Sequence, residues 1–120
     1  MPWSRPPRLR VRIDLAPPSN LRSPSALGAF HSAEIEYAFG TLDGNTSRQW
    51  RPEARALSRM MQAYWINFAR TGDPNGPGLP QWPVYQPASG WAVMYLSGQP
   101  RADKDDQRER YLFLNSVWVK

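Results

Sequence analysis

One helical stripe, between Pro52 and Arg70, constrains the fold of this chain more than any other feature. Its apolar residues recur at the spacing that places side chains on a single face of an α-helix. These residues are Leu57, Met60, Met61, Tyr64, Trp65 and Phe68. Proline is favoured at a first helical position, and Gly72 provides a C-terminal stop. The stripe predicts an amphipathic helix that packs by one face against a core.

Few other elements are predicted to build that core. Alternating apolar residues predict a short strand over residues 9–15, and residues 34–39 are expected to form a helical turn ended by Gly40. A second short strand, at a sheet edge, is expected over 91–96. A terminal helix is expected over 103–118, and its apolar residues come late: Tyr111, Leu114, Val117 and Trp118. We expect these late residues to pack on the same domain.

The composition indicates that the core continues beyond these elements. Thirteen prolines and eight glycines imply many loops, whereas six tryptophans are a large aromatic content for so few elements to bury. The absence of cysteine excludes disulfides and thiolate sites, and a lone histidine argues against zinc. We expect neither a metal nor a cofactor.

The net charge of +5 comes mainly from the first 22 residues, which hold five of the 15 basic residues and one of the ten acidic ones. A basic arm that binds nucleic acid is the least favoured interpretation, because no recognised module or stacking platform accompanies the arginines. No segment approaches the roughly 20 apolar residues that cross a bilayer. The N-terminus has no apolar signal-peptide core, and the compartment of the parent protein stays open.

Two segments carry chemical information. Residues 28–40 read G-A-F-H-S-A-E-I-E-Y-A-F-G and contain His31, the only histidine of the chain. Residues 64–75 read Y-W-I-N-F-A-R-T-G-D-P-N and are followed by W-P-V-Y at 82–85. An imidazole can accept and donate a proton near neutral pH, so His31 is a candidate acid–base group.

These segments, in this order and with similar spacing, resemble the type-B carboxylesterases, which include para-nitrobenzyl esterases and cholinesterases. The resemblance runs from about Leu9 to Tyr111. It implies an α/β fold, the C-terminal part of an α/β-hydrolase. Residues 9–120 are assigned to that domain, and residues 1–8, which lack the resemblance and are rich in proline, to a disordered or unrelated N-terminus.

The resemblance implies that His31 is the base of a Ser-His-acid triad. In this fold the chain order is serine, acid, histidine. However, no G-x-S-x-G motif occurs, and Asp14 is the only acidic residue before His31. The simplest interpretation is that the chain is the C-terminal portion of a carboxylesterase. It would need the missing N-terminal part of the domain to act on a small carboxylic ester, and it should be inactive alone.

Three neighbours of His31 are weaker candidates. Glu34 is either a carboxylate at a helix start or a group that supports the histidine, as the resemblance suggests. Phe30 and Tyr37 either line the substrate site or simply pack beside a buried loop.

The main alternative function is non-catalytic. The chain would then be a relic of the family, or a small interaction module that keeps its helices for a partner. Independently of this choice, the terminal helix could dock on a second subunit instead of on the parent domain and so form a homodimer, as C-terminal helices do in some members of the resembled family.

Overall fold

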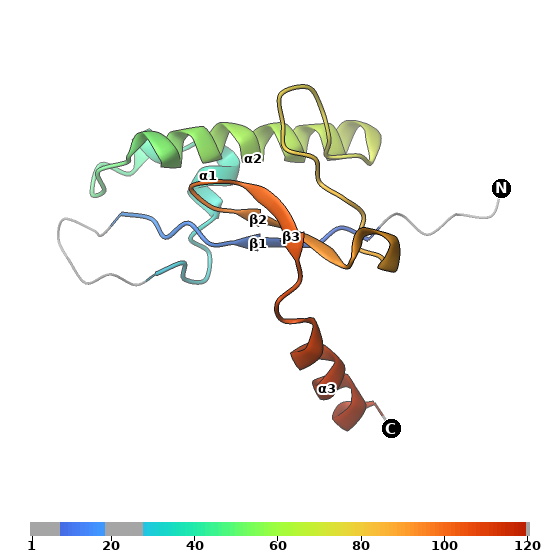
Figure 1. Cartoon of the computed structure of the whole chain (residues 1–120). Helices are drawn as coiled ribbons and strands as arrows, with labels where there is room; N and C mark the ends of the chain where they lie inside the picture. Colours follow the sequence, from blue (N-terminus) through green and yellow to red (C-terminus); the bar gives the residue numbers. More distant parts are fainter. Residues whose placement is uncertain (1–7, 19–27, 120) are drawn as a thin grey trace.

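The computed structural model describes residues 8–18 and 28–119 (Figure 1). Its elements follow in chain order: β1 (Val11–Ile13), α1 (Ile35–Phe39), η1 (Leu42–Gly44), α2 (Pro52–Thr71), η2 (Pro87–Ser89), β2 (Ala92–Leu96), β3 (Arg101–Lys104) and α3 (Arg108–Trp118). The labels α and η mark α-helices and 3₁₀ helices. The strand predicted before the histidine and the helical turn predicted after it are both present, as β1 and α1. β1 is shorter than the predicted strand over 9–15.

The three strands form one mixed sheet in the order β1-β2-β3. β1 pairs with β2 in parallel, with Val11 opposite Met94, and β2 pairs with β3 antiparallel. The parallel pair brings together strands that are about 80 residues apart in the chain, which only a crossover connection can do. Within the described residues, β1 lies at one edge of the sheet.

Two predicted elements differ from the structure. The segment expected at a sheet edge is β2, which is the middle strand and is buried along its whole length. Residues 103 and 104, expected to begin the terminal helix, instead belong to β3, and the helix starts only at Arg108. β3 was missed because its side chains are all exposed and mostly charged, so no apolar alternation marks it.

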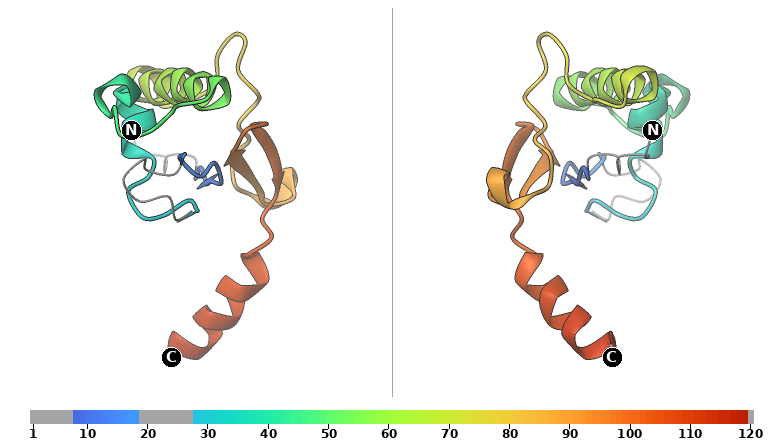
Figure 2. Two further views of the ribbon diagram at one scale, coloured as in Figure 1. Left: turned by 90° about the vertical axis from the view of Figure 1, so that its left-hand side faces the viewer. Right: turned by 90° about the vertical axis from the view of Figure 1, so that its right-hand side faces the viewer.

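The amphipathic helix is confirmed as α2, which lies across one face of the sheet (Figures 1 and 2). Leu57, Met61 and Tyr64 are its deeply buried residues, and they join Met94 and Leu96 of β2 in the core. Trp65 and Phe68, from the same predicted stripe, remain exposed. The core described here therefore covers only part of the apolar face of α2. None of the described helices is long and apolar enough to cross a membrane.

α3 points away from the sheet and α2 (Figure 2). Its first half touches the rest of the chain: the Arg108 guanidinium lies 4.1 Å from the ring centre of Trp91, and the Arg10 guanidinium lies 4.7 Å from that of Tyr111. No residue of α3 is buried, and Trp118 is 83% exposed. The late apolar residues Tyr111, Leu114, Val117 and Trp118 are exposed within the described part of the chain, so their packing on the parent domain stays a prediction.

Candidate functional site

His31 lies on a tight turn directly before α1, and its side chain is exposed. Two backbone hydrogen bonds close this turn: the Ala33 amide donates to the Phe30 carbonyl at 3.1 Å, and the Ile35 amide donates to the Ser32 carbonyl at 3.3 Å. Loops held by regular elements commonly carry functional side chains. The turn therefore presents the imidazole to solvent at a defined place in the chain.

Ser32, the next residue, has a left-handed backbone with φ of 68°. A side chain disfavours this conformation, and non-glycine residues adopt it mainly where the surroundings impose it. Such local strain clusters at functional sites. The observation is consistent with a functional role for the turn, and the sequence carries no signal that would have located it.

α1 anchors the turn to the core from its C-terminal side. Tyr37 is fully buried, and its ring packs edge-on against Trp50 with a centroid distance of 5.6 Å. The buried Ser58 hydroxyl of α2 donates a 2.7 Å hydrogen bond to the Tyr37 carbonyl. Gly40 ends α1 in the left-handed conformation, with φ of 66°, which residues with a side chain rarely adopt. The histidine turn is thus tied to α2 through a five-residue helix.

The other predicted site residues fall in different surroundings. Glu34 is half-buried at the start of α1, where its carboxylate makes no capping hydrogen bond, and Phe30 is 37% exposed. Tyr37 lies in the core, which favours the packing interpretation of this residue. Its hydroxyl has no hydrogen-bond partner among the described residues. Burial raises the pKa of Tyr37, and the nearby charge of Arg48 partly lowers it.

The described residues do not complete a catalytic triad around His31. Within them, no serine hydroxyl and no carboxylate is hydrogen-bonded to the imidazole. They also contain no group of three or more His, Cys, Asp and Glu side chains that could hold a metal ion. Within the described residues, the structure therefore shows one exposed imidazole on a turn with a left-handed residue.

Arg10, directly before β1, and Arg12, within β1, both pair with acidic side chains. Arg10 donates to the buried Asp105 at 2.9 Å, and the Tyr85 hydroxyl donates to the same carboxylate at 2.8 Å. Arg12 pairs with Asp14 and with Asp106, each at 2.9 Å. Arg10 and Arg12 are therefore paired with acidic side chains, whereas Arg5 and Arg22 of the basic arm considered from the sequence lie outside the described residues, so that interpretation is not tested.

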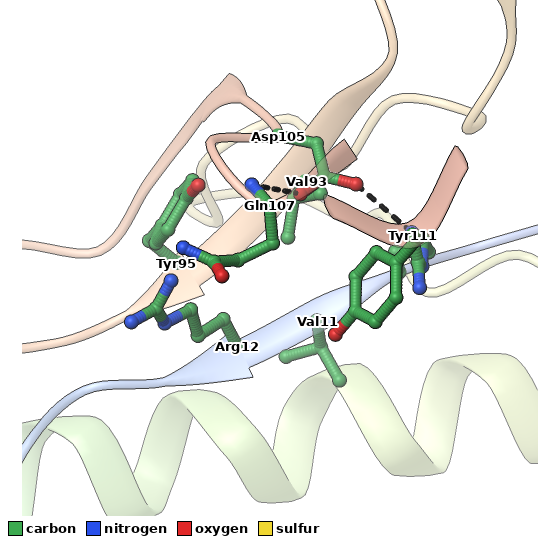
Figure 3. A pocket seen from close by; sticks show the side chains of 8 residues that line it. Val11, Arg12, Val93, Tyr95, Asp105, Gln107 and Tyr111 are labelled. Atoms are coloured by element: carbon green, nitrogen blue, oxygen red, sulfur yellow. Dashed lines mark hydrogen bonds and ion pairs between the residues drawn. The ribbon is translucent and has the colours of Figure 1, made fainter. Parts of the chain in front are cut away.

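A cavity of about 340 Å³ opens beside Arg10 and Arg12 (Figure 3). Its lining comes from β1 and the residue before it, from β2, from the link between β3 and α3, and from α3: Arg10, Val11, Arg12, Val93, Tyr95, Asp105, Gln107 and Tyr111. None of the four predicted site residues lines it. The Asp105 carboxylate inside it already accepts three hydrogen bonds, including one from the Gln107 amide at 3.0 Å, so its role is structural.

Comparison with known proteins identifies the family. The family model of the carboxylesterase family matches residues 12–114. Carboxylesterase 5A of Canis lupus familiaris is 44% identical over 87 residues, which is 68% of this chain and 15% of the relative. Acetylcholinesterase of Gallus gallus is 46% identical over 83 residues, which is 68% of this chain and 11% of that protein.

The fold agrees with this match. The solved structure of a thermophilic PNB esterase superposes with a TM-score of 0.74 and 27% identity, over 90% of this chain and 22% of the esterase chain. The described elements are therefore part of an α/β-hydrolase fold, and the chain spans only a small share of the length of these relatives. Because the family match covers most of the chain, this protein belongs to the carboxylesterase family.

Proposed function

We propose that the parent enzyme is a serine carboxylesterase and that this chain supplies its catalytic base, His31. The observation that carries the proposal is the place of this histidine: an exposed, strained turn inside the segment that matches the carboxylesterase family. The serine nucleophile and the acid that orients the imidazole would come from the part of the domain that this chain does not span. The substrate would be a small carboxylic ester.

The proposed mechanism gives His31 two proton transfers in each half-reaction. The imidazole takes the proton of the serine hydroxyl as the serine attacks the ester carbonyl, and it returns that proton to the leaving alcohol. In deacylation it takes a proton from water, which attacks the acyl-enzyme, and then protonates the released serine. No metal and no cofactor takes part in these steps.

The surroundings of His31 support this role in two ways. Within the described residues the imidazole has no hydrogen-bond partner, so both ring nitrogens are available to a serine and to an acid. The turn is also fixed through α1 to the buried face of α2, which limits its movement while it presents the ring outward. A base needs both access and a defined position.

The experiment is a chimera in which this chain replaces the superposable segment of the thermophilic PNB esterase. We expect the chimera to hydrolyse a short-chain nitrophenyl ester, and His31→Gln to lower kcat/KM by about 10⁴-fold or more, because loss of a triad member has effects of this size. Arg59→Gln, at an exposed position of α2 outside the turn, is the matched control and should leave the rate unchanged. Turnover that persists in a cooperatively folded His31→Gln chimera would exclude His31 as the base.

The isolated chain provides the complementary measurement. We expect no ester hydrolysis above that of its His31→Gln variant, because the nucleophile and the oxyanion hole are both lacking. His31-dependent turnover by the purified chain would contradict the need for the rest of the domain.

A non-catalytic interaction module is the second candidate, and the exposed apolar side chains of α3 favour it. On this interpretation α3 joins two copies, or docks on the missing part of the domain, and His31 has no chemical role. An active chimera whose rate depends on His31 decides against it.

A further inference from the structure

We propose that Arg48 is a positioning residue for the histidine turn, and that it holds the chain on both sides of the segment leading to His31. This inference rests on the proposed function of His31. It concerns a residue that no sequence motif singled out.

One side chain makes both contacts. A terminal nitrogen of the half-buried Arg48 guanidinium donates a hydrogen bond to the carbonyl of Pro18, in the described loop that follows β1. The guanidinium carbon lies 5.7 Å from the ring centre of Phe30, the residue directly before His31. Arg48 therefore links the loop after β1 to the neighbour of the proposed base.

Arginine suits this double contact better than lysine does. The planar guanidinium can donate in its plane to a carbonyl while its face lies against an aromatic ring, whereas an ammonium is a compact point charge. Within residues 8–18 and 28–119, Arg48 has no carboxylate as an ion-pair partner. The contacts with Pro18 and Phe30 are therefore the ones that hold its charged group in a half-buried position.

The segment that carries Arg48 is itself fixed to α1. The Asn45 side-chain amide donates to the Glu36 carboxylate at 2.7 Å, and the indole nitrogen of Trp50 donates to the Asn45 carbonyl at 3.2 Å. The Trp50 ring also packs against the buried Tyr37 ring. The segment from Asn45 to Trp50, which carries Arg48, is thus bound to α1, the helix that follows His31.

This arrangement would serve catalysis by limiting the movement of an exposed base. A displacement of about 1 Å at a catalytic group can lower the rate by roughly 100-fold. Ser32, beside His31, is held in a strained backbone conformation. If the contacts that support the turn are removed, we expect this residue to relax and the turn to move. Arg48 acts on the N-terminal side of the turn, and α1 acts on the C-terminal side.

The test uses the full chain, in which the single histidine gives one set of imidazole NMR signals. Arg48→Met should accelerate hydrogen exchange of the Ala33 and Ile35 amides about tenfold or more, because these amides close the turn. It should also shift and sharpen the His31 signals, while exchange of the Met94 amide in the sheet stays unchanged. Arg48→Lys should restore protection only in part, and Phe30→Leu should give a smaller effect of the same kind.

The matched control is Arg59→Met, at an exposed position of α2, which should change none of these signals. If Arg48→Met leaves Ala33 and Ile35 exchange within about twofold of the unmodified chain, the proposal is wrong. An equal acceleration of the Met94 amide would also overturn it, because the effect would then be global unfolding. If Arg48→Met does not fold, the proposal is tested with Phe30→Leu and Arg48→Lys, through the exchange of the Ala33 and Ile35 amides and the His31 signals.

Activity separates this proposal from the function of His31. In the esterase chimera, Arg48→Met should lower kcat by about 10–100-fold with little change in KM, since it would misplace the base without touching the ester. A change in KM alone, or no change, contradicts the positioning role. If the His31→Gln chimera stays active, the proposed function fails, whereas the NMR measurement still decides whether Arg48 orders the turn.

Discussion

Tyr64 shows how one residue connects the face of α2 to the loop beyond it. Its ring packs edge-on against Trp82 with a centroid distance of 5.2 Å, and its hydroxyl donates to the Pro80 carbonyl at 2.5 Å. The side chain is fully buried, and this burial raises the pKa of Tyr64 to about 12. The residue therefore stabilises the fold in its neutral form, both by packing and by its hydrogen bond.

This pKa predicts alkaline destabilisation. Between pH 10 and 12 the tyrosine of the unfolded chain ionises, while folded Tyr64 keeps its proton. This ionisation lowers the free energy of the unfolded state relative to the folded state. The free energy of unfolding should be unaffected by this group below about pH 9 and fall by up to about 2 kcal/mol as the pH approaches 12. Urea unfolding at a series of pH values measures this.

Tyr64→Phe is the matched variant, since it keeps the ring and removes the titrating group. It should be less stable near neutral pH because the Pro80 carbonyl loses its donor, by about 1 kcal/mol. Its stability should then fall less steeply than that of the unmodified chain above pH 10. Equal slopes for the two proteins would show that Tyr64 does not account for the alkaline effect.

At the scale of elements, α2 and β2 define the core, and α3 is left outside it. The buried residues of α2 meet the apolar side chains of the middle strand, whereas Ile66, Trp65 and Phe68 on the same helix stay exposed. A strand of a parallel sheet is normally covered on both faces. The free apolar positions of α2 therefore mark where the present core is incomplete.

Met61 and Ile66 test which face of α2 carries the stability. Met61 is fully buried, so Met61→Ala should lower the free energy of unfolding by about 2–4 kcal/mol through lost contacts and a residual cavity. Ile66 is 55% exposed, and Ile66→Ala should change it by less than about 1 kcal/mol. Chemical denaturation of the three proteins provides the measurement. Similar losses at both positions would contradict the described packing.

Residues 8–18 and 28–119 form a small core from which one strand edge and the terminal helix are left uncovered. β1 lies at the edge of the described sheet, and α3 extends from the body with its apolar side chains exposed. Unpaired strand edges and exposed apolar patches both favour association. The chain spans 22% of the thermophilic PNB esterase, in which the superposed segment belongs to a larger molecule.

We therefore predict that the purified chain associates with increasing concentration. Sedimentation velocity should show species larger than the monomer at about 100 µM, in the range where exposed apolar surface causes association. Replacing Leu114, Val117 and Trp118 together by serine should shift the distribution toward monomer if α3 contributes. A matched triple substitution of the charged Asp103, Lys104 and Glu109 by serine should leave the distribution of species unchanged. A single monomeric species with a sharp two-state melt would contradict the prediction.

Sequence reasoning was most successful where a pattern is local and periodic. The stripe of α2 and its glycine stop are of this kind, and so is the histidine segment, whose family the comparisons confirm. It failed at β3, whose exposed charged residues show no apolar alternation, and at the position of β2 in the sheet. Strand order depends on contacts between distant segments, and no local pattern encodes which edge a strand will occupy.

Residue identity at short spacing was therefore enough to predict the family, the amphipathic helix and the candidate base His31. The pairing of Arg10 and Arg12 with Asp105 and Asp106, and the contact of Arg48 with Phe30, became visible only in the folded chain. Electrostatic and aromatic contacts of this kind act over a few ångströms between residues far apart in the chain. Their existence depends on how the chain folds back on itself, which residue spacing does not specify.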